Sequence, residues 1–120
     1  MRLREAYVIQ SNDNFLEETR RRIVKAYLPT IIMMRINEAT ITSVNDIISL
    51  IRKSYSIQFS PGTIYPIFYK LEKNGRIKKI PNQAKKIYVL TGIGKSMIEN
   101  FLARTDYFYG IPSKLNEIIK

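Results

Sequence analysis

Most of the side chains that could bind a ligand lie between residues 60 and 90, where hydroxyl and ammonium groups recur among apolar residues. The candidate binding residues are Ser60, Thr63, Tyr65, Tyr69, Lys70, Lys73, Lys78, Lys79, Lys85 and Lys86. Short hydroxyls and cations suit phosphate oxygens, and a tyrosine ring can also lie on a thymine methyl group. These residue types therefore indicate contact with a phosphate-bearing polymer.

The elements that must position these groups are a helix and a hairpin. Ser60 is a typical N-cap and Pro61 suits the first helical position, while Asn74-Gly75 provides a helix end. Apolar residues recur at helical period, and these are Ile64, Ile67, Phe68 and Leu71. Two short β-prone runs follow, at 77–80 and 86–90. A helix over 60–74 with a basic hairpin behind it is the recognition helix and wing of a winged helix-turn-helix.

The same stretch resembles a known family. Its sequence, SPGTIYPIFYKLEKNGRI followed by KKIYVLTGIG, is similar to the pattern of the PadR-type transcriptional regulators. The matching residues are Ser60, Gly62, Thr63, Ile64, Tyr65, Pro66, Phe68, Leu71, Gly75, Tyr88, Leu90, Thr91 and Gly94. The resemblance implies a homodimeric repressor that binds double-stranded DNA, with Tyr65 near the DNA backbone. It also implies that a small aromatic effector is possible at the dimer interface.

The distribution of charge agrees with a nucleic-acid partner. The net charge is +10, from 20 basic and 10 acidic residues. Residues 70–95 contain eight basic side chains and one acidic side chain, a net +7 in 26 residues. A basic surface that only aids solubility would have the same composition. Because the charge coincides with the predicted helix and hairpin, we favour a polyanion binder.

The N-terminal part of the chain leaves several readings open. Residues 1–10 suit a short strand or an arm on a neighbouring subunit, and a helix is predicted to begin at 11–13. Its apolar stripe is Phe15, Leu16, Thr19, Ile23 and Tyr27. Pro29 either kinks this helix or marks the start of a second one, the first helix of the winged-helix core. The basic run at 20–22 suits either phosphate contact or a solvated helix face.

Residues 40–59 predict the elements that precede the recognition helix. Thr40-Ile41-Thr42 suits a short strand that pairs with the wing. Ser43 and Asp46 have the spacing of a capping box. The helix that they begin has a buried stripe formed by Val44, Ile47, Ile48, Ile51 and Tyr55.

The C-terminal part predicts a helix that begins after Thr91 and carries two neighbouring apolar stripes. One small domain cannot cover both stripes, so we expect a second subunit there. The predicted dimer interface is Met97, Ile98, Phe101, Leu102, Tyr107, Phe108 and Tyr109. Aromatic packing between subunits explains the last three as well as an effector does. The run GIGKS at 92–96 is not a phosphate loop, because Val89 stands where that motif needs glycine.

The predicted fold class is mainly α with a small β-hairpin wing (α+β), a winged helix-turn-helix with an additional N-terminal helix and a C-terminal dimerisation helix. We expect one domain over 1–120, divided into an arm and helix at 1–28, a core at 29–90 and a dimerisation helix and tail at 91–120. The chain has neither histidine nor cysteine, and no pair of carboxylates has a catalytic spacing. We therefore predict no enzyme, no metal and no cofactor. We also expect no membrane span and a cytoplasmic location.

The sequence thus favours a sequence-specific DNA-binding transcriptional regulator. Two alternatives are a winged-helix module that binds another protein and a non-specific architectural nucleic-acid-binding protein. An acidic protein partner would suit the first, and equal affinity for any duplex would distinguish the second.

Overall fold

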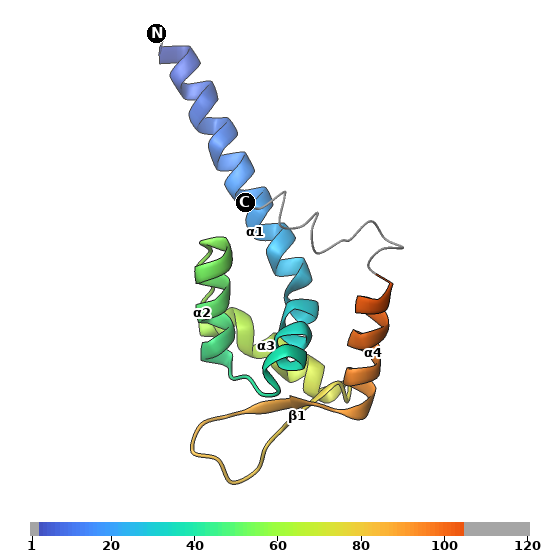
Figure 1. The fold of residues 1–120 in the computed structure, drawn as a ribbon. Coiled ribbons are helices and arrows are strands. Elements are labelled where there is room, and N and C mark those ends of the chain that lie inside the picture. Colours follow the sequence, from blue (N-terminus) through green and yellow to red (C-terminus); the bar gives the residue numbers. More distant parts are fainter. Residues whose placement is uncertain (1–2, 105–120) are drawn as a thin grey trace.

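A computed structural model describes the backbone of residues 3–104 and the side chains of residues 13–104. The elements follow the order α1 (Leu3–Ala39), α2 (Val44–Tyr55), α3 (Pro61–Lys73), β1 (Ile77–Lys79), β2 (Tyr88–Leu90) and α4 (Gly92–Ala103). The second half of α1 lies among α2, α3 and α4, and its N-terminal half projects away from them (Figure 1). The predicted class, mainly helical with a small hairpin, is confirmed.

The first helix differs from the prediction. Residues 3–10 form a helix and not a strand, because α1 is continuous from Leu3 to Ala39 with Pro29 inside it. An arm on a neighbouring subunit stays a prediction. Leu3, Arg4, Glu5 and Ala6 are all good helix formers, so the polar residues at 11–13 do not begin a new helix. Pro29 cannot donate a hydrogen bond to the preceding turn, but the helix continues beyond it. The predicted division at residue 28 therefore falls inside one helix.

The core forms where the second half of α1 meets α2, α3 and the hairpin. Its buried apolar side chains include Val24, Leu28, Ile32 and Ile36 from α1, Ile47 and Ile51 from α2, and Ile64, Phe68 and Leu71 from α3. Phe15 and Leu16, predicted on the buried stripe, are exposed because they lie in the projecting half of α1. Helical period alone does not tell where along a helix the core begins.

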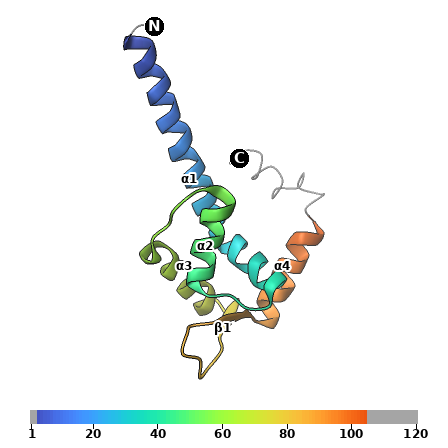
Figure 2. The same cartoon turned by 60° about the vertical axis from the view of Figure 1, so that its left-hand side comes forward.

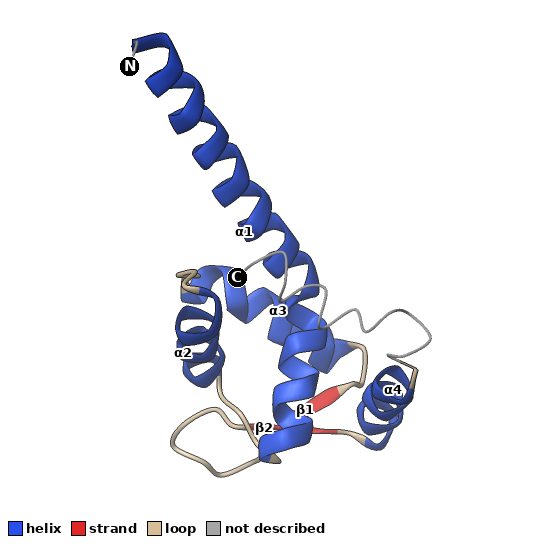
Figure 3. Cartoon of the chain, turned by 45° about the horizontal axis from the view of Figure 1, so that its top comes forward, coloured by secondary structure: helices blue, strands red, loops and turns tan. Residues whose placement is uncertain are grey.

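The wing is a two-stranded antiparallel sheet extended by one bridge. Ile77 pairs with Leu90, Lys78 with Val89 and Lys79 with Tyr88. Thr42 forms the bridge to Tyr88, and their backbone hydrogen bonds are 2.8 and 3.1 Å long. The prediction that 40–42 pairs with the wing is confirmed. This small sheet lies beside α3 and α4 (Figure 3).

Candidate nucleic-acid interface

The recognition helix begins and ends where the sequence predicts, but one detail of its start differs. Ser60 has the extended backbone of an N-cap, and its carbonyl accepts from the amides of Thr63 at 3.0 Å and Ile64 at 3.3 Å. Its hydroxyl makes no capping bond and lies 3.2 Å from Thr63 Oγ1 instead. At the other end, Gly75 has the positive φ of 73° that a C-terminal glycine allows.

The two sides of α3 are clearly different. Ile64, Phe68 and Leu71 are buried in the core. On the opposite side, Tyr65 is 44% exposed and Tyr69 is 65% exposed. Three other predicted contact residues lie on this helix. Thr63 is partly exposed, and Lys70 and Lys73 are exposed. The helix therefore presents hydroxyls, rings and ammonium groups on one outer surface.

The wing brings four lysines to the edge of this surface. Lys78 and Lys79 are exposed on β1, and Lys85 and Lys86 are exposed in the loop between the strands. That loop extends from the sheet beneath α2 and α3 in Figures 1 and 2. The Lys86 ammonium nitrogen lies 5.7 Å from the centroid of the Tyr65 ring, a cation–π distance that brings the wing to the recognition helix.

Asp46 has a second contact that the sequence did not indicate. The predicted capping box is confirmed, since the Ser43 amide donates to Asp46 Oδ2 and the Asp46 amide donates to Ser43 Oγ, both at 3.1 Å. Asp46 Oδ1 also lies 3.9 Å from Lys85 Nζ. Both side chains are more than half exposed, so this ion pair is weak. It joins the wing loop to the start of α2.

The positive charge of the lysines along α3 and β1 is not neutralised by ion pairs with carboxylates of the described residues. Within the part of the chain that the structure describes, no carboxylate forms an ion pair with Lys70, Lys73, Lys78 or Lys79. The exposed ammonium groups of these four lysines attract a polyanion. Burial raises the pKa of Tyr88 beneath this surface, and the nearby Glu72 carboxylate and Tyr65 phenol raise it further.

The residues predicted to form a dimer interface have different environments. Ile98 is 2% exposed and belongs to the core of its own chain, which removes it from the predicted interface. Phe101 and Leu102 are partly buried against the same core, whereas Met97 is 39% exposed. Tyr107, Phe108 and Tyr109 lie outside the described residues. As predicted, Thr91 begins α4 by accepting a hydrogen bond from the Gly94 amide at 3.0 Å.

Two arginines of the run at 20–22 have roles that the sequence did not show. Arg20 and Arg21 donate to backbone carbonyls of Tyr55 and Gln58, at the end of α2 and in the segment that leads to α3.

Among the described residues, no three metal-binding side chains gather into a site. None of the described helices is long and apolar enough to cross a membrane.

The fold and this surface define a class of protein. A three-helix core with a helix-turn-helix pair (α2 and α3), a two-stranded wing and an exposed basic helix is a winged helix-turn-helix. The sequence model of the transcriptional regulator PadR-like family matches residues 33–100. The chain belongs to this family, as the resemblance in residues 60–94 predicted. The family consists of transcriptional regulators, which agrees with the prediction that the chain is not an enzyme.

Solved structures share the fold at low sequence identity. A PadR family transcriptional regulator from Eggerthella lenta matches with a TM-score of 0.67 and 16% identity, over 88% of this chain and 96% of that one. A transcriptional regulator from Clostridium thermocellum matches with a TM-score of 0.60 and 23% identity, over 78% and 93%. A MarR family protein from Bacillus stearothermophilus has a TM-score of 0.55 and 15% identity, over 91% and 79%. No curated protein matches the chain.

Proposed function

We propose that this protein is a sequence-specific double-stranded DNA-binding repressor that acts as a homodimer. The observation that carries the proposal is the orientation of α3. Its apolar stripe is sealed in the core, while Tyr65, Tyr69 and Lys70 stand on the opposite side beside a basic wing. In this arrangement α3 enters the major groove and the wing at 76–90 lies along the backbone.

The residues of this surface divide by role. Ser60, Thr63 and the lysines Lys73, Lys78, Lys79, Lys85 and Lys86 suit phosphate oxygens, which fix the position of the protein on the duplex. From Ser60 to Lys73 the sequence has no arginine, asparagine or glutamine. These side chains recognise a base by forming two hydrogen bonds to its edge. Base discrimination therefore depends on Lys70, on ring contacts of Tyr65 and Tyr69 with thymine methyls, and on DNA shape.

A second copy of the chain would supply the other half of the binding site. Exposed apolar side chains on α4, Ile93 at 63% and Met97 at 39%, support contact between two copies. A two-fold dimer presents its two α3 helices to half-sites about 34 Å apart, one turn of B-DNA. We keep Tyr107, Phe108 and Tyr109 as proposed interface residues, and an aromatic effector there remains a prediction. A cytoplasmic location is part of the same proposal.

Selection of bound sequences from a random duplex pool tests this function. We expect enrichment of a palindrome with half-sites about one helical turn apart. Titration of the enriched duplex should then show that affinity falls about 10³-fold or more between 50 and 200 mM salt, if six to ten phosphates are neutralised. Enrichment of no sequence, or affinity independent of salt, would contradict the proposal.

The repressor role needs its own measurement. Transcription in vitro from a promoter that overlaps the enriched site should fall as the protein is added, because the bound dimer covers the promoter. A rise in transcript would show an activator. A variant with Lys70→Ala and Lys73→Ala, which keeps the core of α3 intact, is the matched control and should leave transcription nearly unchanged.

A further inference from the structure

The segment between α2 and α3 holds the recognition helix at its N-terminal end. Residue Ser56 has a left-handed backbone, with φ 57° and ψ 33°, so the chain turns sharply where α2 ends. Ile57 and Phe59 are buried at 3% and 1% exposure, and Gln58 between them is exposed. Ser60 follows directly as the N-cap of α3. Any movement of this connector, residues 56–59, therefore moves the start of the recognition helix.

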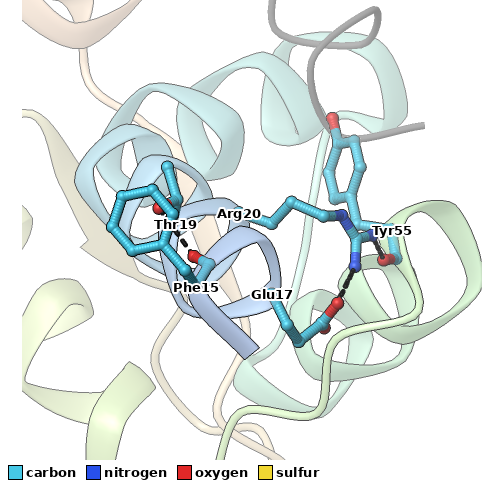
Figure 4. Close-up of polar contacts among 5 residues, drawn as sticks. All are labelled: Phe15, Glu17, Thr19, Arg20 and Tyr55. Carbon is cyan, nitrogen blue, oxygen red and sulfur yellow. Dashed lines mark hydrogen bonds and ion pairs between the residues drawn. The ribbon is translucent and has the colours of Figure 1, made fainter. Parts of the chain in front are cut away.

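Two arginines of α1 contact this part of the chain across more than thirty residues of sequence, one at the last residue of α2 and one in the connector. Arg20 Nη2 donates to the Tyr55 carbonyl at 2.6 Å, and Arg21 Nη1 donates to the Gln58 carbonyl at 3.1 Å. Figure 4 shows the Arg20 guanidinium between the Tyr55 carbonyl and the Glu17 carboxylate, and Arg20 Nη1 lies 2.8 and 3.0 Å from the two oxygens of Glu17. The Glu17 ion pair thus orients Arg20 toward α2.

Each contact has a clear physical reason. The Tyr55 carbonyl is at the last turn of α2, where carbonyls lack partners within the helix and the helix dipole favours a cation. The guanidinium carbon of Arg21 lies 4.7 Å from the centroid of the buried Phe59 ring, so the group stacks on the residue that precedes Ser60. Guanidinium is suited to both interactions because it is planar and carries several fixed donors.

We propose that Arg20 and Arg21 are positioning residues for DNA binding, which fix the start of the recognition helix to α1 and do not themselves contact phosphate. The proposal rests on the DNA binding proposed above. These contacts also couple α1 to the recognition helix, because a displacement of α1 is transmitted through the connector to Ser60 and Thr63. Arg22, the third member of the run, lacks this role, because its side chain is 79% exposed and pairs with Glu18 at 3.5 Å.

Binding measurements on three variants test the proposal. Arg20→Gln, Arg21→Gln and Arg22→Gln remove the same charge from the same helix, so Arg22→Gln is the matched control. Affinity is measured for the duplex that the wild-type protein selects and for a scrambled duplex, each over a range of salt. We expect Arg20→Gln and Arg21→Gln to lower the ratio of the two affinities about tenfold, as the loss of a charge-assisted hydrogen bond predicts. Arg22→Gln should leave the ratio unchanged.

A direct phosphate contact would give a different result. Loss of affinity for both duplexes equally, with the slope of log affinity against log salt reduced by about 0.9 per arginine, would overturn the proposal. If Arg21→Gln does not fold, Arg21→Lys keeps the charge and loses the planar group, and it should still lower the ratio. The proposal would also be overturned if Arg20→Gln and Arg21→Lys both kept the wild-type ratio of affinities for the selected and the scrambled duplex.

Hydrogen exchange tests the same contacts without DNA. The amide of Ser56, at the start of the connector, and the amide of Ile64, in the first turn of α3, donate to the carbonyls of Arg52 and Ser60. They should exchange about tenfold faster in Arg20→Gln and Arg21→Gln than in Arg22→Gln. Unchanged exchange would overturn the proposal. Failure of the wild-type protein to select any duplex would instead contradict the proposed function, and exchange would still decide whether the arginines hold the connector.

Discussion

Gly94, in the first turn of α4, lies against the backbone of the residue that begins the wing. A Cβ atom at this position would be 1.9 Å from the Arg76 carbonyl oxygen and 2.9 Å from its carbonyl carbon. Even a close carbon–oxygen contact needs about 3.3 Å. The Arg76 oxygen cannot yield easily, because it accepts a hydrogen bond from the Thr91 amide at 3.1 Å. Gly94→Ala therefore forces α4 and the start of β1 apart by more than an ångström.

The expected cost follows from these contacts. Overpacking of a well-packed site costs about 1–3 kcal/mol, and loss of the hydrogen bond between Thr91 and Arg76 adds about 1 kcal/mol. We therefore expect Gly94→Ala to destabilise the protein by about 3 kcal/mol, which corresponds to a fall in Tm of roughly 10–20 °C for a domain of this size. Thermal and urea unfolding followed by circular dichroism measure both quantities.

Gly92→Ala is the matched control. Gly92 is also in the first turn of α4, and a Cβ there would meet nothing within 4 Å. Alanine favours the helix by up to about 1 kcal/mol relative to glycine, so this variant should be as stable as the wild type or slightly more so. If Gly94→Ala melts within about 2 °C of Gly92→Ala, the close approach of α4 to Arg76 is refuted.

Three further predictions concern the surface, the pH dependence and the two stripes of α4. Lys73→Ala should reduce the slope of log affinity against log salt by about 0.9, because one phosphate contact is lost, and an unchanged slope would place Lys73 away from the backbone. Since burial raises the pKa of Tyr88 above 10.0, its neutral form stabilises the fold below that pH, and this contribution is lost as the pH rises through the folded-state pKa. Urea unfolding between about pH 9 and 11 should therefore show a smaller loss of stability in Tyr88→Phe than in the wild type, and equal losses would contradict the effect of burial. Ile98→Ala should cost about 2–5 kcal/mol of stability, because Ile98 lies in the core of its own chain. Met97→Glu should cost less stability and should shift the proposed dimer to monomer in sedimentation. The reverse pattern would show that Ile98 faces the partner.

The recognition helix could be predicted from the sequence because its signals are local. Ser60-Pro61 and Asn74-Gly75 define its two ends, and the apolar stripe between them has the period of a helix. The same stripe shows which side faces outward, so Tyr65, Tyr69 and Lys70 were assigned correctly to the exposed side. The capping box of α2 is equally local and was found for the same reason.

What the sequence did not show depends on contacts between distant residues. Arg20 contacts the end of α2 and Arg21 contacts the connector, each more than thirty residues away, and Asp46 contacts Lys85 in the wing loop. In α4 the two apolar stripes look alike, and only the packing reveals that Ile98 belongs to the core of its own chain. Polar residues at 11–13 indicated a helix start, although the helix formers before them allow one continuous helix.

Cross-linking to DNA tests the central claim most directly, namely that the outer side of α3 and the wing face the duplex. The chain contains no cysteine, so Tyr69→Cys, Lys79→Cys and Asn14→Cys each carry a single thiol for a photoactivatable cross-linker. Residue 14 lies in the part of α1 that projects away from the wing (Figure 1) and is the control. We predict that positions 69 and 79 cross-link to the selected duplex and position 14 does not. Cross-linking at position 14 with none at position 69 would contradict the account.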